Sequence, residues 1–96
     1  MYYILDDDGH PVKISNVLIW ASFFQEADRL IAVDIVGDVR ISTVFLGMDY
    51  LNNVVPLLFE TMIFGGDYDG YFKRSPTKKD ALIEHENALN LVKNKE

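Results

Sequence analysis

Residues 30–46 read LIAVDIVGDVRISTVFL, and this stretch decides the fold. It contains two runs rich in β-branched residues, 30–36 and 39–46, which are typical of β-strands. Gly37-Asp38 separates the runs and suits a two-residue type II′ turn, whose first residue is glycine. The stretch therefore predicts an antiparallel hairpin. The pairs expected in it are Val36 with Val39, Val33 with Ser42, and Ile35 with Arg40.

Further strands are predicted on both sides of this hairpin. Residues 56–64 carry apolar side chains on both alternating faces, as expected of a central strand that is covered on both sides. After a glycine-rich break, residues 71–75 predict one more short strand. Near the N-terminus, residues 2–5 and 11–14 flank an Asp-Gly turn and predict a first hairpin.

The segment between the two hairpins predicts a helix from a cap at Ser15 or Asn16 to about Ala27. Ile19 and Phe23 lie on the flank of this helix beside Trp20, outside its main apolar stripe. That stripe is expected to comprise Val17, Trp20, Ala21, Phe24 and Ala27. Burial against a single sheet does not need so wide an apolar arc. We therefore predict that Ile19, Trp20 and Phe23 form an interface.

Thr77 and Asp80 resemble a helix-capping box and predict a C-terminal helix that ends near Lys93. The buried stripe expected in it comprises Ala81, Leu82, His85, Ala88, Leu89 and Val92. Short loops between successive strands favour antiparallel pairing. We therefore expect one α+β domain over residues 1–96, with an antiparallel sheet of four to six strands and two helices packed on it.

The composition of the chain excludes several classes of protein. It has no cysteine, which excludes disulfides, thiolate zinc sites and a cysteine nucleophile. Its net charge is −6, with three Lys/Arg against eleven Asp/Glu in residues 1–70 and six against four in residues 71–96. This imbalance disfavours general nucleic-acid binding and binding to an anionic membrane. No apolar run could span a bilayer and no signal peptide is evident, so we expect a cytoplasmic protein.

Two segments, STVFLGMD at residues 42–49 and PLLFETMIFGG at residues 56–66, resemble a family of small proteins encoded by phages and prophages. Residues 3–6, residues 16–24, Gly37-Asp38 and His85 fit the same resemblance. The chain departs from the family at two places. It has Tyr50 where the family usually has histidine after the aspartate that matches Asp49, and it has residues 51–55 where the family has a glycine-rich loop. The resemblance implies a viral origin and the host cytoplasm as the place of action, without an assigned chemistry.

Glu60 is a carboxylate in an otherwise apolar strand, where burial would require a partner. If the chain after Leu46 returns as a hairpin, Ser42 is expected near Glu60 on the same face, with Arg40 one diagonal away. These three side chains could bind a polar ligand. The alternative, which we favour, is a structural ion pair that satisfies the half-buried carboxylate.

The two histidines do not predict an active site. His85 lies within the apolar stripe of the C-terminal helix and could be a general base, but a hydrogen-bonded core residue is the commoner outcome. His10 lies at a turn. The nearby Asp6-Asp7-Asp8-Gly9 lacks the alternating ligands of a calcium loop, so turn chemistry explains it better. We predict no catalytic residues, no metal site and no cofactor.

A cluster of cations lies around the start of the C-terminal helix. Lys73 and Arg74 precede it, and Lys78 and Lys79 occupy its first turn, where cations oppose the helix dipole. This arrangement could hold a phosphate or a carboxylate of a partner. A solvated turn is the simpler interpretation.

Two functional hypotheses follow. The first is a non-enzymatic protein-interaction module that binds a host factor, such as a defence protein, or a second copy of itself as a homodimer. The alternative is a small-ligand or nucleotide-binding protein, or a small enzyme, that uses Glu60, Arg40 and Ser42, with His85 nearby.

Overall fold

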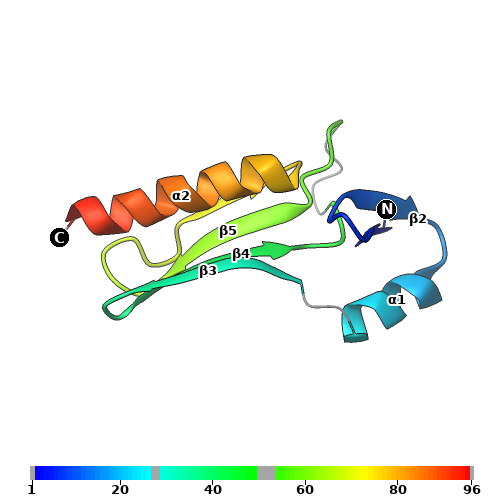
Figure 1. Ribbon diagram of the computed structural model, residues 1–96, viewed down its shortest axis with the longest axis horizontal. Coiled ribbons are helices and arrows are strands. Elements are labelled where there is room, and N and C mark those ends of the chain that lie inside the picture. Colours follow the sequence, from blue (N-terminus) through cyan, green and yellow to red (C-terminus); the bar gives the residue numbers. More distant parts are fainter. Residues whose placement is uncertain (1, 27–28, 50–53, 96) are drawn as a thin grey trace.

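The computed structural model describes residues 2–26, 29–49 and 54–95. Their elements follow the predicted α+β order (Figure 1). The elements are β1 (Tyr2–Leu5), β2 (Pro11–Ile14), α1 (Val17–Glu26), β3 (Leu30–Val36), β4 (Val39–Phe45), β5 (Phe59–Phe64), β6 (Phe72–Ser75) and α2 (Lys78–Lys95). A four-stranded antiparallel sheet has the order β3-β4-β5-β6, and β1 and β2 form a separate two-stranded sheet. The α+β prediction is confirmed.

The β3–β4 hairpin has the predicted register. Val36 pairs with Val39, and the turn between them begins at Gly37, whose φ of 59° lies in the left-handed region that glycine adopts freely. The other two predicted pairs, Val33 with Ser42 and Ile35 with Arg40, also form. Local turn chemistry is therefore sufficient to set the pairing of this hairpin.

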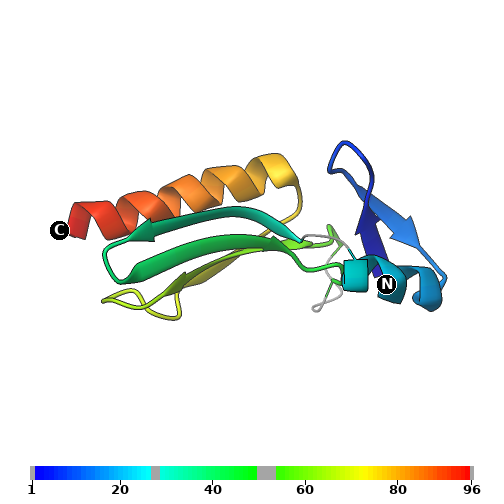
Figure 2. The same ribbon diagram turned by 60° about the horizontal axis from the view of Figure 1, so that its bottom comes forward.

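Strand β5 is shorter and less covered than predicted. It begins at Phe59, three residues after the expected start, and lies between β4 and β6. Its odd-numbered residues face α2 and are buried, whereas Phe64 on the opposite face is exposed. Among the described elements, α2 is the helix that packs on this sheet, and it covers one face (Figure 2). The prediction that both faces of β5 are covered is wrong for the described part of the chain.

Helix α2 builds the main core. Thr77 caps it, because Thr77 Oγ1 accepts a hydrogen bond from the Asp80 N–H at 3.1 Å. The helix packs its apolar stripe on the centre of the sheet. The buried core residues at this contact are Ile41, Ile63, Ala88, Leu89 and Val92. Leu82 was expected in the same stripe, but it is 44% exposed and lines a groove between α2 and the N-terminal hairpin.

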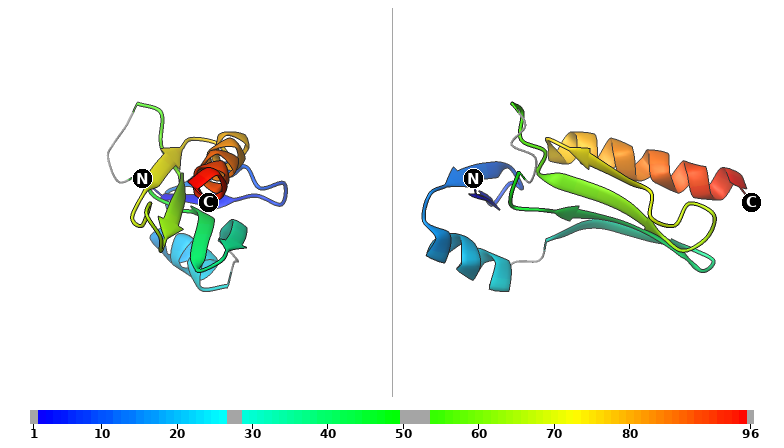
Figure 3. Two further views of the ribbon diagram at one scale, coloured as in Figure 1. Left: turned by 90° about the vertical axis from the view of Figure 1, so that its left-hand side faces the viewer. Right: turned by 180° about the vertical axis from the view of Figure 1, so that it is seen from behind.

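The first hairpin and α1 lie together at one end of the sheet, which gives the molecule an elongated shape of 46 × 29 × 22 Å (Figure 3). Asn16 caps α1, since Asn16 Oδ1 accepts hydrogen bonds from the N–H groups of Leu18 and Ile19. A second cluster, Phe45, Leu58, Phe59 and Ala81, packs against Phe23 and Phe24 of α1. Aromatic packing therefore joins this end unit to the sheet.

The buried face of α1 differs from the predicted stripe. Phe23 contacts the ring of Phe45 edge-on, with ring centroids 6.2 Å apart, whereas Val17 and Ala21 are exposed. Trp20 donates from Nε1 to the carbonyl oxygen of Gly47 at 3.2 Å. The predicted stripe is therefore wrong at Val17 and Ala21, and Ala27 lies outside the described residues. The helix is rotated because Trp20 and Phe23 both point inward.

Ionisation of Tyr71 makes the stability of the fold depend on pH in the alkaline range. Burial, and next the negative charge of Glu84, raise the pKa of Tyr71 above its ordinary value of 10.0. Folding thus favours the neutral phenol. The stability that Tyr71 contributes is complete below pH 10.0 and is lost as the pH rises through the higher pKa of the folded state.

We expect the Tyr71→Phe variant to lose less stability than the wild type between about pH 9 and about pH 11, since it has no phenol to ionise at this position. Urea unfolding of both proteins at each pH measures this difference. The other tyrosines are common to both proteins and cancel. Parallel losses in the two proteins would contradict the prediction.

None of the helices in the described residues contains an apolar stretch long enough to cross a membrane.

Candidate functional site

A chain of polar side chains lies beneath α2. His85 is buried, and its Nε2 lies 2.8 Å from Asp34 Oδ2 on β3. Its Nδ1 lies 2.8 Å from Thr43 Oγ1, which in turn lies 2.7 Å from Thr61 Oγ1. Thr43 and Thr61 are cross-strand partners on β4 and β5, so the sheet register places them side by side.

The direction of these hydrogen bonds follows from the chemistry of the groups. An ionised carboxylate can only accept, so Nε2 of His85 carries a proton and donates to Asp34. In the neutral imidazole, Nδ1 then accepts from the Thr43 hydroxyl, which accepts from Thr61. The buried hydroxyls and both ring nitrogens all have partners, which satisfies the requirement for burial.

This geometry favours a structural role for His85 over the general base that the sequence left open. Thr43 and Thr61 are fully buried, so no substrate can reach their hydroxyl groups. Asp34, at the other end of the chain, is half-exposed. Sequence reasoning missed Asp34 as the partner of His85. The available signal was its position in β3, since Asp34 alternates with Ala32 and Val36 on the side of the sheet that packs against α2.

Glu60 has a different partner from the predicted one. It lies opposite Arg74 across β5 and β6, and Arg74 Nε donates to Glu60 Oε2 at 3.0 Å. Arg40 instead lies opposite Phe64. Ser42 lies opposite Met62, which places it diagonal to Glu60, and it is buried. The predicted proximity of Arg40 to Glu60 is therefore wrong, and the three side chains do not converge on one ligand.

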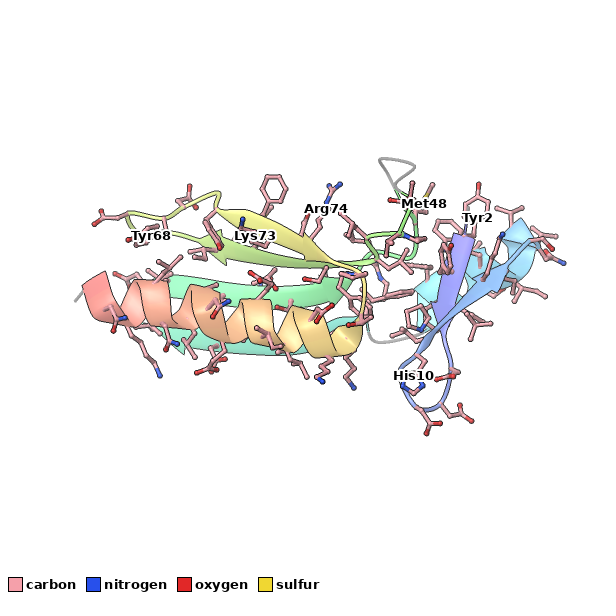
Figure 4. All side chains as sticks on the ribbon, turned by 90° about the horizontal axis from the view of Figure 1, so that it is seen from above. Tyr2, His10, Met48, Tyr68, Lys73 and Arg74 are labelled. Carbon is pink, nitrogen blue, oxygen red and sulfur yellow. The ribbon has the colours of Figure 1, made fainter. Side chains whose placement is uncertain are left out.

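The sheet face opposite α2 carries exposed aromatic and aliphatic side chains. Its members, which we call the open face, are Leu30, Val33, Ile35, Arg40, Ser42, Val44, Glu60, Met62, Phe64, Phe72 and Arg74. Phe64 is 44% exposed and Phe72 is 52% exposed. The guanidinium carbon of Arg40 lies 6.0 Å from the centroid of Phe64, and that of Arg74 lies 5.7 Å from the centroid of Phe72. The open face thus combines aromatic rings with arginines (Figure 4 shows Arg74).

The charge of the open face differs from that of the whole chain. It carries two arginines and one glutamate, and the glutamate already pairs with Arg74. Arg40 forms no ion pair with a carboxylate of the described residues. A cationic, aromatic face on a chain of net charge −6 is suited to an apolar partner that carries a carboxylate.

The predicted α1 interface is only partly available. Ile19 is half-exposed, and Val17 and Leu18 beside it are exposed as well. Phe23 packs into the core, and Trp20 contacts Tyr2 and Phe24 with ring centroids 4.7 Å away in each case. The large exposed apolar side chains of α1 are therefore those of its first turn, and of the three residues predicted to form the interface Ile19 is the exposed one.

The predicted cluster of cations is divided in the structure. Lys73 lies opposite Thr61 and Arg74 lies opposite Glu60, so they occupy opposite faces of β6. Lys78 and Lys79 line a groove of about 820 Å³ between the first hairpin and α2. The other lining residues are Asp8, His10, Pro11, Thr77, Leu82, Ile83 and Glu86. The two acidic residues offset the charge of the two lysines, so the groove does not favour an anion strongly.

The turn of the first hairpin gathers three groups that metals can bind. One ligand atom from each of Asp6, Asp8 and His10 lies within 4.8 Å of the others, and all three residues are exposed (Figure 4 shows His10 at the turn). Asp6 Oδ1 already accepts hydrogen bonds from the N–H groups of Asp8 and His10. These bonds explain the cluster by turn chemistry, as expected from the sequence.

Comparison of the chain with models of protein families, with curated proteins and with solved structures finds no match. Tyr50 and residues 51–53, at which the sequence was expected to depart from a phage and prophage family, lie outside the described residues.

Proposed function

We propose that this protein is a non-enzymatic binding module whose open face binds a segment of another protein. The observation that carries the proposal is the exposure of Phe64 and Phe72 beside Arg40 and Arg74 on a sheet face that no described helix covers. Aromatic residues and arginine are the residue types enriched in the centres of protein interfaces.

The sequence of β5 supports this proposal. A strand with apolar residues on both faces is typical of a sheet that is covered on both sides. Helix α2 covers the face of Phe59 and Ile63, whereas Met62 and Phe64 have no such layer among the described elements. A bound partner would supply the second layer and would remove the exposed rings from water.

The charges of the open face favour a different protein over a second copy as its occupant. In a face-to-face pair of identical chains, Arg40 and Arg74 would face a surface with the same excess of arginine. The carboxylate of Glu60 is already used by Arg74. We therefore expect the partner segment to combine apolar side chains with an aspartate or glutamate that reaches Arg40.

The resemblance to phage and prophage proteins suggests where such a partner would be found. We propose a host protein in the cytoplasm of an infected bacterium, and a defence protein is one such host factor. The alternative of a ligand site at Glu60, Arg40 and Ser42 has less support. The Glu60 carboxylate accepts a hydrogen bond from Arg74, and Arg40 lies opposite Phe64 rather than near Glu60.

The partner can be identified by placing a photo-crosslinking amino acid at position 64 or 72 in cells, with position 90 as the control. Asn90 is exposed on α2, away from the open face. A protein that is captured from both positions of the open face, but not from position 90, is then purified for direct measurement of binding.

In that purified pair we expect Arg40→Glu to weaken binding at least about tenfold, because a charge pair at an interface becomes a repulsion. Lys73→Glu is the matched control, since it makes the same charge change on the opposite face of β6. Equal losses in the two variants would indicate a general charge effect. Unchanged binding by Arg40→Glu would contradict the proposal.

A further inference from the structure

Strand β3 is an edge of the sheet. Its register shifts between Leu30 and Ala32, but its regular half from Val33 to Val36 lacks the usual protection against pairing. It has seven residues, and among the described strands β4 alone pairs with it, on one side. Its sequence contains no proline, lysine or arginine, which natural edge strands use to prevent association. The single charged residue, Asp34, is held by His85 on the α2 side of the sheet. Figure 1 shows β3 along the margin of the sheet.

The free backbone groups of this edge can be assigned from the register. The N–H of Phe45 donates to the carbonyl of Arg29, so the odd-numbered residues of β4 bond toward β3. Their partners Asp34 and Val36 therefore direct their backbone groups to β4. It follows that Val33 and Ile35 direct their N–H and C=O groups away from the sheet. Both side chains are also exposed, Ile35 by 65%.

The opposite edge of the sheet is protected. Strand β6 has four residues, and two of them are Lys73 and Arg74. A short, cationic strand disfavours the addition of another strand. Head-to-tail pairing of β3 with β6 of another copy would also continue without closing, whereas pairing of β3 with β3 closes as a two-fold dimer.

We propose that two copies of this chain pair through β3, antiparallel across a two-fold axis, so that their four-stranded sheets become one continuous sheet. The two-fold axis lies at Ile35, so Asp34, Ile35 and Val36 of the two strands pair with one another, in the regular half of β3 beyond the register shift between Leu30 and Ala32. An axis at Asp34 would place two carboxylates directly opposite each other, which is destabilising. An axis at Ile35 places Asp34 opposite Val36 of the second copy and pairs the two apolar Ile35 side chains.

This dimer does not depend on the proposed function. The dimer uses β3, and the binding proposal uses the arginines and aromatic rings of β4, β5 and β6. Pairing would leave Phe64 and Phe72 of both copies on one extended face. Loss of partner binding in Arg40→Glu would leave the dimer intact, so the two proposals fail separately.

Single-cysteine crosslinking tests the pairing, because the chain itself has no cysteine. We expect Ile35→Cys to form a disulfide-linked dimer under mild oxidation. Phe72→Cys is the matched control, since Phe72 lies on the same face at the other edge and is 52% exposed, against 65% for Ile35. It is expected to remain monomeric on a denaturing gel. Equal crosslinking in both variants would overturn the proposal.

Light scattering after size exclusion tests the same contact without a covalent bond. We expect a dimer for the wild type and for Phe72→Lys, and at least about tenfold weaker dimerisation for Ile35→Lys. Circular dichroism confirms that each variant is folded. A wild type that stays monomeric at every concentration reached would overturn the proposed dimer. The same conclusion would follow if Phe72→Lys dissociated the dimer and Ile35→Lys did not.

Discussion

Gly47→Ala is expected to lower the free energy of unfolding by about 3 kcal/mol, a large fraction of the stability of a domain of this size. Gly47 has a φ of 78°, where a residue with a Cβ atom is strained. A Cβ atom built on Gly47 would also lie 1.8 Å from Cζ of Phe24. The ring would therefore have to move.

The ring of Phe24 has little freedom to make room. It lies 4.7 Å from the ring of Trp20 and 5.4 Å from that of Phe23, and it stacks on Phe45 with centroids 6.1 Å apart. The guanidinium carbon of Arg29 lies 4.5 Å from its centroid. A shift of Phe24 would thus disturb the aromatic contact between α1 and the sheet.

Gly47 also joins the two units by hydrogen bonds. Its carbonyl oxygen accepts from the N–H of Tyr3 at 2.9 Å and from Nε1 of Trp20 at 3.2 Å. We therefore expect Gly47→Ala to loosen the first hairpin and α1 as well as to destabilise the whole fold. Hydrogen exchange should increase more in residues 2–26 than in α2.

Gly70→Ala separates the two causes. Gly70 has a φ of 87°, but a Cβ atom there would have no neighbour within 4 Å. This control is expected to cost only about 1 kcal/mol, the strain of the backbone alone. Urea unfolding of both variants gives the comparison. Equal losses of unfolding free energy in the two variants would show that the Phe24 ring moves away from the new Cβ atom without penalty. They would also show that Gly47 does not hold the first hairpin and α1 tightly to the sheet.

The elements were predictable from the sequence where the deciding chemistry is local. Gly37-Asp38 determines the turn of the β3–β4 hairpin and hence its register, and Asn16 and Thr77 cap their helices through neighbouring N–H groups. These features depend on residues a few positions apart. Residue type and short spacing were enough to recognise them.

The orientation of α1 was not predictable in the same way. Residues 17–24 are apolar apart from Ser22, so periodicity does not identify which face is buried. The choice depends on contacts across the chain. Trp20 Nε1 requires an acceptor, which Gly47 provides, and Phe23 packs against Phe45. Both partners lie more than 20 positions away.

The partners of the buried polar groups were missed for a related reason. A strand joined to β4 by the long segment 46–58 has no turn that sets its register, so the partner of Glu60 could not be read from spacing. Arg74 was assigned to a cluster of cations because Lys73 precedes it, although neighbours in a strand lie on opposite faces. Alternation in β6 could have separated the two.

Thr43→Val is expected to lower the free energy of unfolding by about 3 kcal/mol, because it leaves two buried groups without a partner. Valine keeps the shape of threonine and removes the hydroxyl that joins Nδ1 of His85 to Oγ1 of Thr61. Ser42→Ala is the control. Ser42 is also buried in β4, but its hydroxyl is not part of this chain of hydrogen bonds, so a cost below about 1 kcal/mol is expected.

The combined variant Thr43→Val, Thr61→Val and His85→Leu should be more stable than Thr43→Val alone and should lie within about 1 kcal/mol of the wild type. It removes every buried member of the chain, so no buried donor or acceptor remains unpaired, and the half-exposed Asp34 regains water. This recovery is expected only if the chain serves the structure. Unfolding in urea measures all four proteins. A combined variant that is less stable than Thr43→Val alone would show that these hydrogen bonds contribute net stability that apolar packing does not replace.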